Sequence, residues 1–139
     1  MSAQDNVALV KKGYAAFSSG DMETLLSLFA EDIAWTSPTV EGSDFSGQCK
    51  GRAEVAAFFE KVAAAEEILE FTQDEFIAQD DRVVVTGRSR TRVRSTGRTL
   101  EYPYVHLFTV RAGKVQDFTE YFDTARAADA YRRGTAADA

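Results

Sequence analysis

The sequence predicts an α+β fold, with helices laid on one face of a curved, mostly antiparallel sheet. Two observations predict it. In the first half of the chain, apolar residues recur every three or four positions, as in amphipathic helices. From about residue 68 they alternate with polar residues, as in strands that bury one face. A sheet bent around a helix in this order is expected to form a cone with an internal cavity.

Two helices are expected at the start of the chain. An apolar stripe over residues 3–19 indicates the first helix, and the break "SGD" ends it. Asp21 in that break can cap the second helix, whose stripe runs from residue 22 to near Glu31.

A strand, a loop and a third helix are expected next. The stretch "IAWTSP" predicts a short strand that stops at Pro38. Residues 39–51 carry three glycines and little periodicity, so we expect a loop there, placed to cover the mouth of a pocket. A further apolar stripe predicts a helix over residues 52–66.

A meander of four strands and a short terminal helix complete the predicted order. The turn signals "DD", "STG" and "RAG" separate strands at residues 68–79, 83–94, 100–110 and 115–122. The segment "DTARAADAYRR" predicts the last helix, and residues 134–139 are expected to be disordered. We expect all 139 residues to form a single domain.

The composition favours an aromatic interior and limits the classes of partner that the protein is expected to bind. Ten Phe and five Tyr within a 45% hydrophobic chain indicate a substantial interior, and favour a hollow lined with rings. A net charge of −6 argues against nucleic acid or an anionic membrane as a partner. The sequence has no apolar run of transmembrane length.

The low number of cysteine and histidine residues indicates where the protein is located and which cofactors it can bind. Cys49 is the single cysteine, so no internal disulfide can form, which favours a reducing, cytoplasmic location. One cysteine and one histidine disfavour a dedicated transition-metal site, and the sequence has no glycine-rich phosphate loop. Any chemistry is therefore expected to need no metal and no cofactor.

Three stretches resemble a known family. "YAAFSSGDMETLLSLFAEDIAW", "EVAAFFEKV" and "HLFTVRAGKVQDFTEYFD" resemble the SnoaL-like proteins, which share a cone-shaped fold with ketosteroid isomerase and nuclear transport factor. The similarity runs from Val7 to about Tyr131. It is more specific for the fold than for function.

The resemblance implies that the chain is not a ketosteroid isomerase. Those enzymes use a carboxylate base, a tyrosine and a protonated acid. Matched on "SGD", the base falls at Ser37 and the tyrosine at Gly13. The protonated acid falls at Val105, or at His106 if the hairpin shifts by one.

Asp123 is the first candidate for catalysis. The resemblance implies it, because SnoaL-like polyketide cyclases carry their acid/base at this position, although Thr119 stands where they commonly have tryptophan. As a pocket acid among rings, Asp123 would be suited to proton transfer by desolvation. The alternative is a helix N-cap, a role worth about 1 kcal/mol.

His106 is the second candidate, because imidazole is readily tuned for proton transfer near neutral pH. A structural role is the alternative. If Ala112 and Gly113 form a two-residue turn, His106 opposes Thr119. A longer turn points His106 away from the pocket. We favour the shorter turn, which gives one polar, aromatic face to Tyr102, Tyr104, His106, Thr119, Tyr121 and Asp123.

Further residues are expected to line the pocket or to fill the core, and the sequence leaves both roles open. Ser37 is expected to be a hydrogen-bond donor rather than a nucleophile, because no base adjoins it. The predicted ligand-binding residues are Tyr14, Phe17, Trp35, Ser37, Phe58, Tyr104 and Tyr121.

A basic stripe marks one strand face, in the run "RSRTRVR". Alternation places its arginines together, which predicts a solvated face or salt bridges across a dimer. The resemblance implies a homodimer through the outer face of the sheet. The four arginines are Arg88, Arg90, Arg92 and Arg94.

The sequence thus predicts a protein that binds a small apolar or aromatic molecule in a cavity. Asp123 and His106 would carry out acid/base chemistry of the isomerase, cyclase, dehydratase or epoxide-hydrolase type. The alternative is a non-catalytic member of the same fold that binds a ligand or a protein partner.

Overall fold

The computed structural model describes residues 2–45 and 47–132. The expected disordered tail, residues 134–139, lies outside the described residues. Four helices occur in the described part of the chain: α1 (Ala3–Ser18), α2 (Met22–Ser27), α3 (Arg52–Ala65) and α4 (Thr124–Tyr131). The strands are β1 (Phe29–Ser37), β2 (Gly47–Lys50), β3 (Glu66–Gln79), β4 (Arg82–Val93), β5 (Thr99–Arg111) and β6 (Lys114–Phe122).

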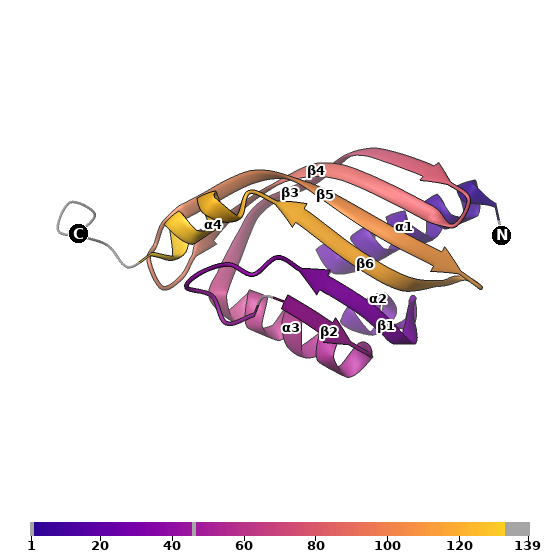
Figure 1. The fold of residues 1–139 in the computed structure, drawn as a ribbon, viewed down its shortest axis with the longest axis horizontal. Coiled ribbons are helices and arrows are strands. Elements are labelled where there is room, and N and C mark those ends of the chain that lie inside the picture. The colour runs from indigo at the N-terminus through magenta and orange to yellow at the C-terminus, as the bar shows by residue number, and fades with distance from the viewer. Residues whose placement is uncertain (1, 46, 133–139) are drawn as a thin grey trace.

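The strands form one curved sheet in the order β2-β1-β6-β5-β4-β3. Every neighbouring pair is antiparallel except β1 and β6, which run parallel. Helices α1, α2 and α3 lie behind this sheet in Figure 1, and α4 lies at one end of it. The α+β prediction, with a curved and mostly antiparallel sheet around N-terminal helices, is confirmed.

The helix starts follow from local chemistry. At the start of α1, the Ser2 hydroxyl accepts the Asp5 backbone N–H while the Asp5 carboxylate accepts the Ser2 N–H, which is a capping box. Asp21 caps α2 as predicted, accepting the backbone N–H of Thr24. Val10 and Tyr14 on α1 are buried among the rings of the main core.

Two elements differ from the sequence prediction. The second helix ends at Ser27, and the chain enters β1 at Phe29, because β1 and β6 pair in parallel from that point. A short strand, β2, lies within the predicted loop and pairs with the end of β1. Both differences come from pairing with a distant partner strand, which a local pattern does not contain.

The β5–β6 hairpin decides which side chains face the interior. Its two-residue turn is confirmed, because Arg111 pairs with Lys114. The register then shifts, since Val110 pairs with Val115 but Thr109 pairs with Asp117. One extra residue on β6 is a β-bulge, and it exchanges the two faces of the strand beyond it.

The bulge overturns the predicted pairing. His106 pairs with Glu120 and not with Thr119. Glu120 therefore shares the inner face with His106, whereas Tyr121 is 55% exposed on the outer face and Asp123 is exposed beyond the strand end. The prediction that His106, Tyr121 and Asp123 share one face is wrong, because turn length alone does not fix the register.

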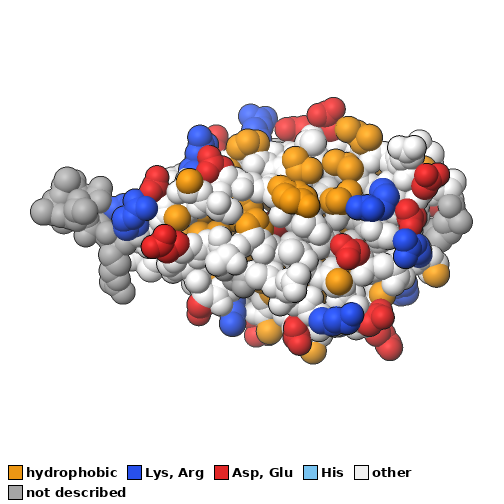
Figure 2. Space-filling model, in the orientation of Figure 1, with side chains coloured by type: hydrophobic (Ala, Val, Ile, Leu, Met, Phe, Trp, Pro, Cys, Tyr) orange, Lys and Arg blue, Asp and Glu red, His pale blue; other side chains and the backbone are white. Residues whose placement is uncertain are grey.

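The basic stripe pairs within the chain. Arg88, Arg90 and Arg92 each lie 3.6–3.7 Å from a carboxylate of β3, on side chains that are largely exposed. Such exposed pairs contribute little to stability. Figure 2 shows hydrophobic side chains gathered over the middle of this face of the molecule. Val105 on β5 and Tyr121 on β6 are exposed hydrophobic residues that pair with each other.

None of the helices within residues 2–45 and 47–132 is both long and apolar enough to cross a membrane.

Candidate functional site

A cavity of about 170 Å³ lies between the concave face of the sheet and the helices. Rings from seven helices and strands line most of it, which makes its wall predominantly apolar. Val40 and Phe45, from the segment predicted to cover a pocket mouth, also line it. Of the predicted residues, the wall contains Tyr14, Phe17, Trp35, Phe58, Tyr104 and His106.

A chain of three polar groups crosses this wall. The Tyr14 hydroxyl lies 2.6 Å from His106 Nδ1, a hydrogen bond that joins α1 to β5. On the other side of the imidazole, Nε2 lies 3.4 Å from Glu120 Oε2, within ion-pair distance. The His106 side chain is 8% exposed and that of Glu120 is 20% exposed. The three side chains therefore form a row of phenol, imidazole and carboxylate, with the first two buried and the carboxylate partly buried.

The Tyr14 phenol determines which ring nitrogen of His106 accepts a hydrogen bond and which carries the proton. Burial raises the pKa of Tyr14 above its usual range, and the neighbouring Tyr104 and Glu120 raise it further. Tyr14 therefore stays protonated, and its hydroxyl donates a hydrogen bond to Nδ1, its one hydrogen-bond partner among the described residues. The ring proton is then on Nε2, next to the Glu120 carboxylate, which can accept it. Among the described residues, no hydrogen bond reaches Glu120 Oε1, which leaves that oxygen available to a ligand.

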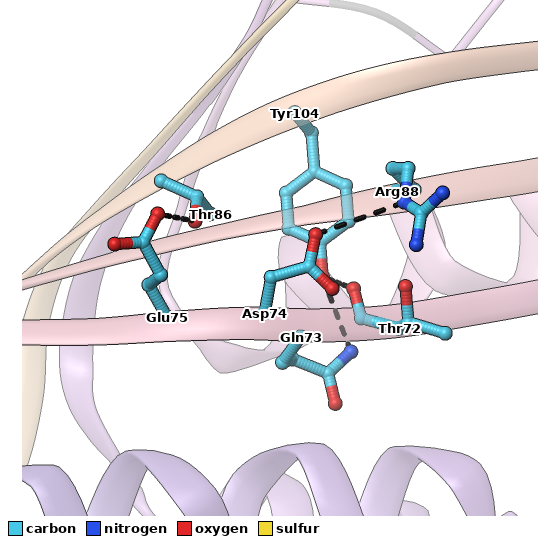
Figure 3. Close-up of polar contacts among 7 residues, drawn as sticks. All are labelled: Thr72, Gln73, Asp74, Glu75, Thr86, Arg88 and Tyr104. Atoms are coloured by element: carbon cyan, nitrogen blue, oxygen red, sulfur yellow. Dashed lines mark hydrogen bonds and ion pairs between the residues drawn. The ribbon is translucent and has the colours of Figure 1, made fainter.

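Tyr104 supports the imidazole from one side. Its ring stacks on His106 with centroids 4.1 Å apart. Figure 3 shows Tyr104 reaching across the neighbouring strand, where its hydroxyl donates to the Thr72 carbonyl at 2.6 Å and accepts from Gln73 at 3.1 Å. Burial raises the pKa of Tyr104 to about 12, although its hydrogen bond from Gln73 acts in the opposite direction.

Gly87 makes this crossing possible. A Cβ at Gly87 would lie 2.0 Å from the Thr72 carbonyl oxygen and 2.4 Å from the Tyr104 hydroxyl. Neither distance is compatible with a side chain, so β4 needs glycine where the phenol passes over it.

The indole N–H of Trp35 is a hydrogen-bond donor without an acceptor among the described residues. Its ring stacks on Phe118 at 3.8 Å, and Phe118 in turn packs edge-on to His106 at 4.9 Å. The buried Trp35 Nε1 has no hydrogen-bond partner among the described residues. The same holds for the Ser37 hydroxyl, which is buried at the end of β1 but is not on the cavity wall.

A second polar group occupies the wall where β3 begins. Glu66 is 8% exposed, and its carboxylate accepts hydrogen bonds from Thr91 at 2.9 Å and from the Tyr131 hydroxyl on α4. Burial, and then the Glu66 carboxylate, raise the pKa of Tyr131 above its usual range. Tyr131 therefore remains a donor.

Asp123 lies outside the cavity. Its side chain is 49% exposed and accepts the backbone N–H of Arg126 at 3.0 Å, which is the N-cap geometry of α4. Tyr121 likewise is not on the cavity wall. The catalytic role predicted for Asp123 and the ligand contact predicted for Tyr121 stay predictions that these positions do not favour.

Sequence reasoning missed both cavity carboxylates. For Glu120 a signal was present, because Phe118, Glu120 and Phe122 alternate along one strand and all three line the cavity. Glu66 carried no such signal, since it lies at the junction of α3 and β3, where helical and strand periodicity meet.

Comparison with known proteins fixes the family. The model of the SnoaL-like domain matches residues 10–118. The chain belongs to the SnoaL-like family. A SnoaL-like assignment agrees with solved structures of NTF2-like proteins, which share the fold.

Three similar structures illustrate this. An NTF2-like protein from Burkholderia xenovorans LB400 is 42% identical with a TM-score of 0.87, over 95% of this chain and 99% of that one. A second, from Burkholderia pseudomallei K96243, is 32% identical with a TM-score of 0.82, over 94% and 98%. TerC, co-crystallised with polyporic acid, is 30% identical with a TM-score of 0.81, over 91% and 98%.

Proposed function

We propose that this SnoaL-like protein binds a small apolar or aromatic molecule and transfers protons on it without a metal or cofactor. The observation that supports this most is the contact of Tyr14 with His106, and of His106 with Glu120, on the wall of an otherwise aromatic cavity. A polar group held beside an acid or base, away from water, is what proton-transfer chemistry requires. TerC, the 30% identical protein co-crystallised with polyporic acid, supports a small-molecule role.

Glu120 is the proton acceptor in this proposal. Its Oε1 is free to meet an acidic proton of the ligand, and Nε2 of His106 lies 3.4 Å from Oε2, where the ring N–H faces the carboxylate. Tyr14 acts as a positioning residue, because its hydrogen bond to Nδ1 keeps the other ring nitrogen directed at Glu120. Trp35 Nε1 is a donor for an oxygen atom on which negative charge develops.

A model ketone tests the proposal without knowledge of the natural substrate. The bicyclic ketone 2-tetralone exchanges the protons next to its carbonyl into D₂O, and proton NMR follows the loss of their signal. We expect the protein to accelerate this exchange. Glu120→Gln should reduce the acceleration by roughly 10²-fold or more, because it removes the proton acceptor. Binding of tetralone without any acceleration would leave only the non-catalytic ligand-binding role.

Asp123→Asn tests whether Asp123 or Glu120 is the carboxylate that accepts the proton. It makes the same carboxylate-to-amide change at the exposed cap of α4. We expect exchange at the wild-type rate, since Asp123 is not on the cavity wall. A variant that loses exchange while Glu120→Gln keeps it would return the catalytic role to Asp123.

A further inference from the structure

Apart from His106, the charged side chains on the cavity wall are all acidic. Glu66 and Glu120 are its acids, and none of the described residues that line the cavity is Lys or Arg. The proton-transfer proposal uses Glu120 and leaves Glu66 without a function. A negative interior of this kind favours cationic or neutral molecules over anions.

Glu66 is hydrogen-bonded but not neutralised. Thr91 donates to Oε1 and Tyr131 donates to Oε2, and both donors are uncharged hydroxyls. No Lys, Arg or His lies within ion-pair distance of Glu66 among the described residues. A carboxylate also has acceptor sites beyond the two that are used here.

The missing partner of a buried carboxylate is a cation. Hydrogen bonds from hydroxyls satisfy lone pairs, but an ionised group in an apolar interior is costly unless an opposite charge accompanies it. Because the wall offers no such charge, a ligand is the remaining source. A protonated amine can bring both the charge and further N–H donors.

Tyr102 connects this position to the proposed proton-transfer site. It lies on the cavity wall, and its ring stacks on Phe122 at 4.6 Å. Burial raises the pKa of Tyr102 above its usual range, and the carboxylates of Glu120 and Glu66 both raise it further. Tyr102 is therefore within electrostatic reach of both acids, and all three residues lie on the wall of the same cavity.

We propose that Glu66 binds a protonated amine, so that the molecule taken up by the cavity is an amine-bearing aromatic compound and not an organic anion. This inference rests on the proposed function, since it names the class of ligand for the same cavity. It assigns Glu66 to recognition and leaves proton transfer to Glu120.

Three probes of matched shape test the charge preference. Isothermal titration calorimetry at pH 7.5 compares 2-naphthylmethylamine, 2-naphthylmethanol and 2-naphthoate, which are cationic, neutral and anionic. We expect the amine to bind roughly tenfold or more tightly than the alcohol, because a hydrogen bond to a charged group is stronger than a neutral one. The naphthoate should bind most weakly of the three.

Glu66→Gln locates the preference. This variant should bring the affinities for the amine and the alcohol together and leave the alcohol unchanged. Glu67→Gln is the matched control, because it makes the same change of charge at a half-exposed side chain that pairs with Arg92. The control should keep the full preference for the amine.

Tyr131→Phe tests the inference if Glu66→Gln does not fold. It removes one uncharged donor and keeps the carboxylate. The preference for the amine should therefore persist in this variant. Loss of the preference would show that the hydroxyl and not the carboxylate selects the ligand, and would overturn the inference.

The remaining outcomes separate this inference from the proposed function. Equal binding of all three probes overturns the inference and leaves ligand binding intact. A preference that is lost in Glu120→Gln but kept in Glu66→Gln also overturns it, because the amine then lies at the proton-transfer end. No binding of any probe contradicts the proposed function, and the inference fails with it.

Discussion

At the scale of single residues, the hydrogen bond between Tyr14 and His106 determines the state of the imidazole. Tyr14 retains its proton because burial raises its pKa, and Nδ1 is the one hydrogen-bond partner of its hydroxyl among the described residues. Because the Glu120 carboxylate beside Nε2 only accepts, we expect Nδ1 to accept and Nε2 to carry the ring proton. We expect two-bond proton–nitrogen NMR spectra to show this tautomer at neutral pH, and the assignment is direct because the chain has one histidine.

Tyr14→Phe provides the comparison for this prediction. Without the phenol, Nδ1 loses its donor, and we expect a mixture of the two tautomers. A wild-type protein whose proton sits on Nδ1 would contradict the proposed orientation of His106 toward Glu120.

A second residue-scale prediction concerns alkaline pH. Burial raises the pKa of Tyr104 from 10.0 to about 12, so the folded protein holds this proton more tightly than the unfolded chain does. The contribution of the protonated Tyr104 to the free energy of unfolding is therefore fully present below pH 10. It is lost as the pH rises from 10 to about 12. Urea unfolding across this range should show the free energy of unfolding falling with pH, with a smaller slope in Tyr104→Phe. An equal slope in both proteins would argue against a buried phenol.

At the scale of elements, the crossing of Tyr104 over β4 depends on Gly87. Gly87→Ala would place a Cβ 2.0 Å from a backbone carbonyl oxygen, so the strands or the phenol must move. We expect the free energy of unfolding to fall by about 1–3 kcal/mol, measured by urea denaturation. His106 should also lose its stacking partner, which its NMR ring signals would report. An unperturbed variant would mean that the Tyr104 ring does not take this path.

Elements also differ in how far the sequence predicts them. The Asp21 cap of α2 and the apolar face of α1 could be predicted from the sequence, because a helix cap and an amphipathic face are local properties. The β6 bulge was not, because nothing local marks Gln116 as the extra residue in the pairing with β5. That one residue moved the candidate acid from Asp123 to Glu120. The fold class survived the error because it depends on the order of elements and not on register.

At the scale of the whole molecule, the outer face of the sheet is the candidate for self-association. Val105 is 38% exposed and Tyr121 is 55% exposed, as direct partners in the β5–β6 pairing. We propose that two copies of the chain pair through this face. Tyr121→Glu should shift the protein from dimer to monomer in sedimentation analysis, because it places a charge in an apolar contact.

Ala57→Glu is the control for this prediction, since it adds the same charge at an exposed residue on α3. It should leave the dimer intact. A wild-type protein that sediments as a monomer at all concentrations would contradict the proposed pairing.

The cavity is also a property of the whole molecule. The abundance of rings and the order of elements predicted a cone with a hollow interior, whereas the two acids on the cavity wall come from β3 and β6, far apart in the chain. Residues so far apart in the chain share no local pattern, which is why ligand class had to be inferred from the structure.

The central claim is that a ligand in this cavity lies against His106 and Glu120. It is tested most directly by following the ring NMR signals of His106, the single histidine, during titration with 2-tetralone. We expect a saturable shift of these signals with the midpoint found by calorimetry. Calorimetric binding with His106 signals that do not move would contradict the claim, because the ligand would then lie elsewhere.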